Sequence, residues 1–225
     1  MNDGAGGWTV ASVQVGVPQP LETPQGIVAS SIVRRVVGGR VAVDAEGVAG
    51  NAQANLVNHG GPDKAVCVYV SKHRTYWASR LGRDLAPGAF GENLSLDGPD
   101  EDEACIGDTF RVGTALVQVS QPRQPCFKLS AVLGEARLIA WIVEHGSTGY
   151  YFRVLEAGEV WAGAPVSLVR RIHPEVTVRA AHRAGVGTPF DADRSRAVLV
   201  PELAASWAST VVKRLGATGP SGGEP

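Results

Sequence analysis

Residues 108–120 read DTFRVGTALVQVS, two short apolar runs separated by Gly113-Thr114. Both runs contain β-branched or aromatic residues typical of strands, and the glycine-containing pair between them predicts a hairpin. Similar runs occur along most of the chain. We expect further strands at residues 11–15, 26–34, 40–43, 65–70, 94–96 and 166–172. Many short strands at close spacing, mostly without alternating helices, predict a closed or nearly closed β-barrel.

Helical patterns interrupt these strands twice and then follow them. The first two helices are predicted at residues 72–81 and 135–145. After His173-Pro174 we expect three short helices, at residues 176–184, 191–199 and 201–215. The last of them carries an apolar stripe, made of Leu203, Trp207, Val211 and Leu215.

The sequence therefore predicts a mainly β protein, a β-barrel with a few helices and a small C-terminal three-helix domain. We expect an N-terminal tail with the first strand, then the barrel, then the helices, then a disordered tail. These parts are assigned to residues 1–25, 26–172, 173–216 and 217–225.

The composition excludes several classes of protein. The chain has 225 residues, 44% hydrophobic and 19% charged, which is enough for a full core. A formal net charge of -1 gives no overall attraction to nucleic acid or to an anionic membrane. No secretory signal or membrane-spanning run is visible, and the three cysteines have no disulfide-framework spacing. We expect a cytoplasmic protein that binds neither nucleic acid nor membranes.

One cysteine has unusual neighbours. Residues 120–129 read SQPRQPCFKL, in which Pro122 and Pro125 stiffen the chain around Cys126. Arg123 and Lys128 are close in sequence, and nearby cations favour the thiolate that a soft metal or an electrophile needs. The alternative is a small buried apolar residue. We expect such a structural role for Cys67, inside the apolar strand at 65–70, and for Cys105.

Two glycine-containing loops also precede strands. In NHGGPDK, residues 58–64, the backbone of Gly60 and Gly61 with His59 and Lys64 predicts an anion cradle, or else an ordinary polar turn. In FGEN, residues 90–93, Glu92 is a candidate general acid or base, or else a solvated carboxylate. We expect these loops and the Cys126 loop to converge on one mouth of the barrel.

Together these motifs resemble a known family. NHGGPDKAVCVY, FGENLSLDG, CIGDTFRVGTALVQVSQPRQPCFKL and GYYFRVLEAGEV look like the MOSC domain (molybdenum cofactor sulfurase C-terminal) of the YiiM-type subgroup. The resemblance covers residues 26–171, and residues 176–215 resemble the three-helix domain that follows in that subgroup. Family members often have aspartate where this chain has Asn51 and histidine where it has Val68.

The resemblance implies a MOSC-type barrel whose pocket holds the molybdenum cofactor (molybdopterin), with Cys126 as metal ligand and catalytic residue. Further residues are implied to bind the cofactor: His59, Gly60, Gly61, Lys64, Glu92, Asn93, Gln121, Arg123 and Lys128. The implied activity is reduction of N-hydroxylated substrates, hydroxylamines and bases such as 6-hydroxylaminopurine. The sequence has no flavin motif and no iron–sulfur cysteine set, so a separate electron-donor reductase is expected. A homodimer is compatible with the sequence.

Three alternatives stay open at the level of sequence. The chain is a carrier or sulfur-handling module that binds the cofactor without turnover, or a Cys–His hydrolase that uses Cys126 and His59. In the third reading, the helical region is an interaction module on an inert barrel. Molybdenum content separates the first alternative from the other two, and turnover separates enzyme from carrier.

Overall fold

A computed structural model describes residues 7–56 and 60–217 of the chain. The strands of the described residues are β1 (Trp8–Val15), β2 (Gln19–Thr23), β3 (Gly26–Ser30), β4 (Arg35–Val37), β5 (Val41–Asp44), β6 (Gly47–Val48), β7 (Val66–Val70), β8 (Leu94–Asp97), β9 (Thr109–Val112), β10 (Ala115–Pro122), β11 (Tyr150–Glu156), β12 (Gly158–Val160) and β13 (Pro165–Arg170).

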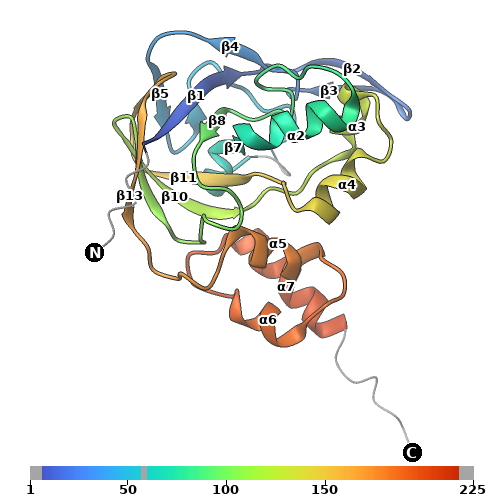
Figure 1. Cartoon of the computed structure of the whole chain (residues 1–225), viewed down its shortest axis with the longest axis vertical. Helices are drawn as coiled ribbons and strands as arrows, with labels where there is room; N and C mark the ends of the chain where they lie inside the picture. The colour runs from blue at the N-terminus through green and yellow to red at the C-terminus, as the bar shows by residue number, and fades with distance from the viewer. Residues whose placement is uncertain (1–6, 57–59, 218–225) are drawn as a thin grey trace, which may run out of the picture.

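Seven of these strands form a closed barrel, seen at the top of Figure 1. The sheet runs in the order β13-β9-β10-β11-β7-β8-β1, and it closes because β13 also pairs with β1. Strand β4 pairs with the C-terminal end of β1. Strands β7 and β8 pair in parallel. Strands β5, β6 and β12 form a small separate sheet, and β2 and β3 form a hairpin.

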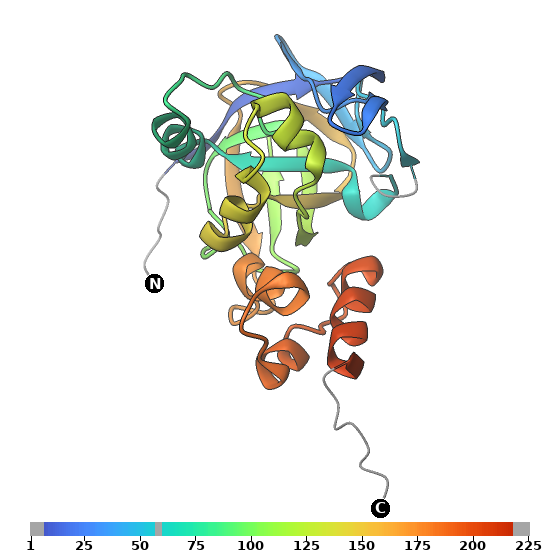
Figure 2. The ribbon, with the colours of Figure 1, turned by 90° about the vertical axis from the view of Figure 1, so that its right-hand side faces the viewer.

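Helices lie on the outside and at one end of the barrel. They are the 3-10 helix η1 (Pro62–Lys64) and the α-helices α2 (Ser71–Leu81), α3 (Phe127–Leu133), α4 (Leu138–His145), α5 (Val178–Val186), α6 (Ala192–Ala197) and α7 (Ala205–Ala217). Helices α5, α6 and α7 are grouped at one end of the barrel (Figure 2). None of the described helices is long and apolar enough to cross a membrane.

The interior of the barrel is filled by apolar side chains. Strand β7 shows the alternation, because Val66, Val68 and Val70 belong to the interior cluster, whereas Tyr69 belongs to a second cluster with residues of α2, α3 and α4. Successive side chains of a strand point to opposite faces, so Cys67 shares the outer face with Tyr69. The barrel interior is therefore a packed core.

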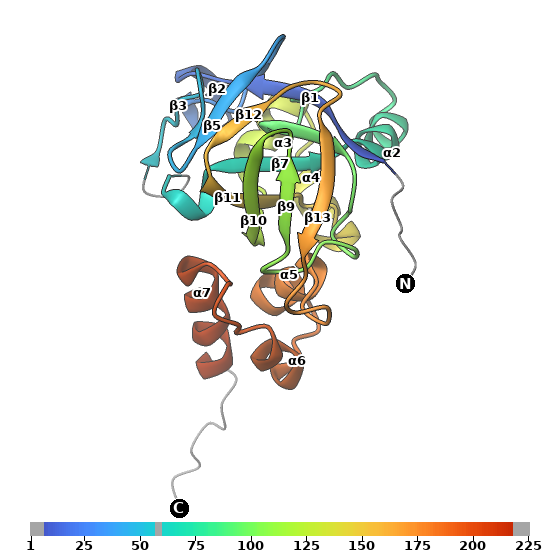
Figure 3. The ribbon, with the colours of Figure 1, turned by 90° about the vertical axis from the view of Figure 1, so that its left-hand side faces the viewer.

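The C-terminal helices extend this same core. Val178 and Ala181 of α5 and Trp207 and Val211 of α7 belong to the apolar cluster that fills the barrel. Backbone hydrogen bonds also join the two parts, from Val178 N to Ala104 O at 2.9 Å. In Figure 3 the helices sit directly below the ends of β9, β10 and β13. The barrel and the helices share one hydrophobic core.

The structure confirms the mainly β class, the barrel and the hairpin at Gly113-Thr114. The last helix begins at Ala205 rather than Pro201, because the Ala204 amide donates to Ser120 O of the barrel at 2.9 Å instead of starting a helical turn. The strand expected at 26–34 ends at Ser30. Strand β11 and helix α3 are additions that the pattern did not predict. Ala217 still belongs to α7, and residues 218–225 of the expected tail lie outside the described residues.

Candidate functional site

Three neighbouring strands place a row of side chains on the outer face of the barrel. Cys67 of β7 lies opposite Tyr151 of β11, and Tyr151 lies opposite Gln121 of β10. Residues two apart in a regular strand face the same side, so Gln121 would follow Val119 into the core. The register between β10 and β11 shifts between Val119 and Gln121, and this bulge turns Gln121 outward.

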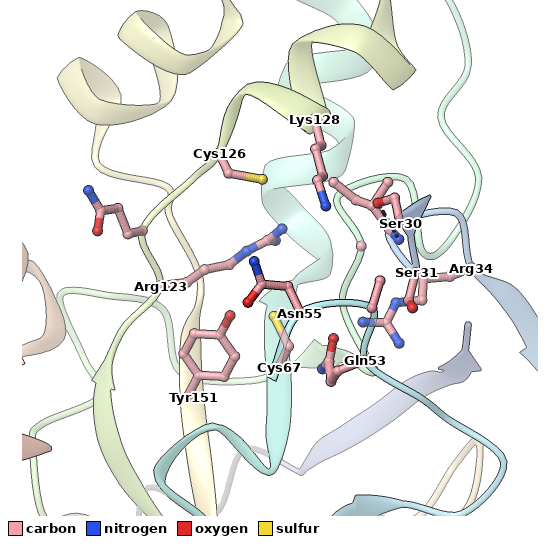
Figure 4. A pocket seen from close by; sticks show the side chains of 14 residues that line it. Ser30, Ser31, Arg34, Gln53, Asn55, Cys67, Arg123, Cys126, Lys128 and Tyr151 are labelled. Carbon is pink, nitrogen blue, oxygen red and sulfur yellow. Dashed lines mark hydrogen bonds between the residues drawn. The ribbon is translucent and has the colours of Figure 1, made fainter. Parts of the chain in front are cut away.

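Cys126 lies just beyond the end of β10, at the junction with α3. The Arg123 amide donates to Gly149 O at 3.0 Å, which holds the start of the loop against the chain before β11. Cys126 has extended backbone angles, φ -119° and ψ 160°, and its side chain is partly buried. In Figure 4 the Cys126 thiol and the Arg123 guanidinium point into one hollow with Cys67 and Tyr151. The loop between β10 and α3 thus presents a thiol to a pocket.

Two adjoining pockets surround this thiol. The inner pocket lies between the barrel wall and the segments at residues 30–34 and 53–55. Its described lining is Ser30, Ser31, Ile32, Arg34, Gln53, Ala54, Asn55, Cys67, Gly91, Arg123, Gln124, Cys126, Lys128 and Tyr151. The outer pocket, of about 380 Å³, is lined by Asn55, Lys64, Gln121, Gln124, Pro125, Cys126, Phe127, Lys128, Tyr151, Ser206, Trp207 and Thr210. Cys126 belongs to both, so the thiol lies where they meet.

Both pockets are positively charged. Arg34, Arg123 and Lys128 line the inner pocket, and Lys64 and Lys128 line the outer one. No aspartate or glutamate is among the described residues that line either pocket, although the whole chain has a net charge of -1. Such a concentration of cations in a concave site attracts an anionic ligand.

Arg34 carries unused hydrogen-bonding capacity. Its Nη1 donates to the side-chain oxygen of Asn51, which also accepts from the Gly16 amide at 3.1 Å. Its Nε is buried without a hydrogen-bond partner in the described structure, and so is the hydroxyl of Ser31. A buried donor without an acceptor is costly, so these two atoms are suited to a ligand that brings acceptors.

Burial shifts the pKa values of several groups in the site. It lowers the pKa of Arg34 and of Lys64. Burial also disfavours the charge of Arg123, but Cys67 and Tyr151 more than offset this effect and raise the pKa of Arg123. The pKa of the Cys67 thiol is raised by burial, although Arg123 and Arg34 oppose the change. The thiol beside the two arginines is therefore neutral near pH 7.

Glu92 and Asn93 lie behind the pocket wall and support it. The Glu92 carboxylate accepts from Gly88 N at 2.8 Å, Phe90 N at 3.1 Å and Ser95 Oγ at 2.9 Å. Asn93 accepts from Cys67 N at 3.2 Å through its side chain and donates to Cys67 O at 2.7 Å through its own amide. The Glu92 hydrogen bonds fix the loop that brings Gly91 to the inner pocket. The Asn93 hydrogen bonds hold the backbone at Cys67.

The NHGGPDK loop is placed in part. Lys64, at the end of η1, lines the outer pocket. Gly61 has φ +93°, a conformation that favours glycine, but neither Gly60 nor Gly61 is among the described lining residues. His59 lies outside the described residues, so its place in the site stays a prediction. The position of Lys64 agrees with an anion cradle shared with the Cys126 loop.

The remaining predicted residues lie at the pockets, and the structure adds others. Lys128 donates from Nζ to Ala29 O of β3 at 3.1 Å, and Gln121 is buried at the outer pocket. Arg34, Tyr151 and Cys67 were not predicted as site residues. The expectation of a core role for Cys67 is correct about burial, at 3% exposed, but the residue also lines the inner pocket. A sequence pattern shows that a strand is buried, and it does not show that one face is covered by a pocket.

The fold and the site define a class: a β-barrel protein whose outer wall carries a pocket with a thiol and several cations, suited to an anionic ligand. The family model of the MOSC domain matches residues 55–167. The chain belongs to the MOSC domain family, whose members are associated with the molybdenum cofactor. The resemblance noted in the motifs is thereby confirmed.

Two proteins named YiiM and one named a reductase are similar to this chain. The crystal structure of YiiM from Geobacillus stearothermophilus has a TM-score of 0.78 and 38% identity, covering 92% of this chain and 99% of that one. Protein YiiM of Escherichia coli is 40% identical over 190 residues, 82% of this chain and 84% of that protein. A reductase of Gibberella moniliformis is 33% identical over 157 residues, 68% of this chain and 28% of the reductase.

Proposed function

We propose that this chain binds the molybdenum cofactor beside Cys126, with the cofactor's phosphate in the inner pocket, and reduces N-hydroxylated compounds, such as hydroxylamines and bases of the 6-hydroxylaminopurine type. The observation that carries the proposal is a partly accessible thiol beside three cations, Arg34, Arg123 and Lys128, in a pocket whose described lining has no carboxylate. Membership of the MOSC family supports the cofactor. The relative named as a reductase supports the class of reaction.

The inner pocket has a cavity of about 50 Å³, and its donors suit the phosphate end of this cofactor. The cofactor's pterin carries a phosphate, which arginine, lysine and hydroxyl donors bind well, and the unpartnered Arg34 Nε and Ser31 Oγ are such donors. Among the described residues, no group of three or more His, Cys, Asp or Glu is placed to hold a metal ion. A metal at Cys126 would therefore rely on ligands that arrive with it, as dithiolene sulfurs do.

The reaction has a simple balance. R–NH–OH takes up two electrons and two protons and gives R–NH2 and water, with the N–O bond broken. When bound, the cofactor supplies a metal centre able to pass both electrons, which in this proposal come from a separate reductase. Within the chain, Cys126 would hold the metal, and Arg34, Arg123 and Lys128 would bind the phosphate. Lys64, which lines the outer pocket together with Cys126, would donate a proton to the departing hydroxyl group.

The first test measures the metal. Protein made in a host that synthesises the cofactor is assayed for molybdenum, for pterin and for reduction of 6-hydroxylaminopurine with a chemical reductant. We expect near-stoichiometric molybdenum and turnover in the unmodified protein. Cys126→Ser should lose both, because an alcohol is a much poorer ligand for a soft metal than a thiolate.

A matched control is Cys105→Ser, at a buried thiol that lies outside the described lining of both pockets. This variant should retain molybdenum. Stoichiometric molybdenum with turnover in Cys126→Ser would show that Cys126 is not the ligand. Molybdenum without turnover in the unmodified protein would point to a cofactor carrier instead of an enzyme.

A further inference from the structure

The C-terminal helices provide one wall of the outer pocket. Ser206, Trp207 and Thr210 of α7 line it, facing Lys64, Tyr151 and the Cys126 loop. These three residues come from a part of the chain that carries none of the family motifs and lies beyond the matched region at 55–167. The pocket around the thiol is therefore completed by the helical region.

This wall is firmly fixed to the barrel. The Ala204 amide donates to Ser120 O at 2.9 Å, and Ser206 Oγ donates to the side-chain oxygen of Gln121 at 3.1 Å. The Trp207 ring is 3% exposed, and its Nε1 donates to Ala181 O at 2.9 Å. Because α7 is bonded to the very end of β10, its position is coupled to the loop that begins there and carries Cys126.

The chemistry of the outer pocket suits a flat aromatic heterocycle. Pro125 and Phe127 contribute apolar surface, and Phe127 is 44% exposed, whereas Trp207 is buried behind the α7 wall. Gln124 contributes an amide group, which can both donate to and accept from the edge of such a ring, whereas the Gln121 amide already bonds to Pro122 O and Ser206 Oγ. A pocket with an exposed aromatic face and an amide binds a planar ring by stacking and orients it by its edge.

We propose that α7 is the wall that decides which substrates reach Cys126. In this view the outer pocket binds a planar N-hydroxylated heterocycle of about purine size, with Ser206 and Thr210 setting the width of the pocket. This inference rests on the proposed function for its substrate. The assignment of α7 as a wall of the path to the thiol stands on geometry, and it has a readout that needs neither cofactor nor turnover.

The test narrows the pocket from the α7 side. Thr210→Trp puts a large ring into the outer pocket, and Ser209→Trp puts the same ring on the neighbouring exposed residue, which is not part of the described lining. In cofactor-free protein, the labelling rate of Cys126 is measured by peptide mass spectrometry with small iodoacetamide and with bulky fluorescein maleimide. In loaded protein, kcat/KM is measured for hydroxylamine and for 6-hydroxylaminopurine.

We expect Thr210→Trp to slow labelling of Cys126 by the bulky reagent by about tenfold or more. The value of kcat/KM for 6-hydroxylaminopurine should fall by about the same factor, because a narrower pocket excludes large ligands selectively. Iodoacetamide labelling and hydroxylamine turnover should stay within about twofold. Ser209→Trp should change neither. Equal losses with small and large reagents, or the same loss in Ser209→Trp, would overturn the inference. If the unmodified protein reduces no N-hydroxylated compound, the proposed function fails, while the labelling result still decides whether α7 is the wall.

Discussion

Two thiols, Cys67 and Cys126, line the same pocket but differ in their exposure to solvent. Cys67 lies in strand β7, lines the inner pocket together with Arg123 and Tyr151, and is 3% exposed, whereas Cys126 is partly exposed at the junction of both pockets. Cys105 is also buried, and desolvation raises its pKa to about 11. Reactivity with electrophiles requires both access and thiolate, so the three cysteines should be chemically distinct.

This difference predicts the order of alkylation. At pH 8, iodoacetamide should modify Cys126 at least about tenfold faster than Cys67 or Cys105, because burial raises the pKa of both of the slower thiols. Mass spectrometry of peptides at timed intervals measures the three rates. Comparable rates at Cys67 and Cys126 would show that the strand face is open to solvent.

Arg34 offers a second prediction about single residues. Arg34→Gln removes a cation and the unpartnered Nε from the inner pocket, so the affinity for the cofactor should fall by about tenfold. Arg35→Gln is the control, because Arg35 is exposed on β4 and lies outside the described lining. Pterin content after dialysis at low and high salt measures the effect. Equal retention by both variants would remove Arg34 from the binding site.

At the scale of elements, helices α5 and α7 are in unusually close contact. A Cβ atom added at Gly185 of α5 would lie 2.7 Å from the Trp207 ring of α7. Alanine normally favours a helix over glycine by up to ~1 kcal/mol, yet here it must push the helices apart. The absence of a side chain at Gly185 therefore positions the α7 wall.

Gly185→Ala should lower the free energy of unfolding by about 1–3 kcal/mol, the usual cost of overpacking. Gly216→Ala, also in a helix but with no atom within 4 Å of the added Cβ, should leave stability unchanged or raise it slightly. Urea denaturation of both variants makes the comparison. A stabilised Gly185→Ala protein would show that α7 is free to move away.

The sequence predicts those elements whose own pattern is strong. The apolar run at 65–70, the hairpin at 108–120 and helix α2 are all in place. Strand β11 is not predicted, because its second half, RVLE, mixes charged and apolar residues and is only partly buried, and its pairing depends on strands distant in sequence. Helix α3 is not predicted either, because it begins directly after Pro125 and Cys126, which we interpret from the sequence as part of a loop. The bulge that turns Gln121 outward also depends on the partner strand, so no local pattern predicts it.

At the scale of the whole molecule, the shared core contains a buried histidine at the junction with the helices. His182 of α5 is 1% exposed, stacks on Trp207, and its Nε2 has no hydrogen-bond partner in the described structure. Burial lowers its pKa to about 4, with Arg179 and Arg183 acting in the same direction and Glu101 opposing them. The folded protein therefore holds His182 neutral.

Stability should fall in acid for this reason. The unfolded chain takes up a proton at His182 below pH 6.5, whereas the folded chain resists until about pH 4. Between these values unfolding is favoured as the pH falls, by up to about 3 kcal/mol from this group. His182→Phe should reduce the loss of stability between pH 7 and pH 4.5, as measured by urea midpoints. An unchanged pH dependence would place the titrating group elsewhere.

The closure of the barrel joins distant parts of the chain. Trp8 and Thr9 of β1 pair with Val166 and Pro165 of β13. During synthesis on the ribosome, the first strand emerges long before its partner, and about three quarters of the chain must be translated before the two can meet. Until then one edge of β1 is unpaired and its apolar face is exposed to solvent. This protein should therefore depend on chaperones more during translation than after release.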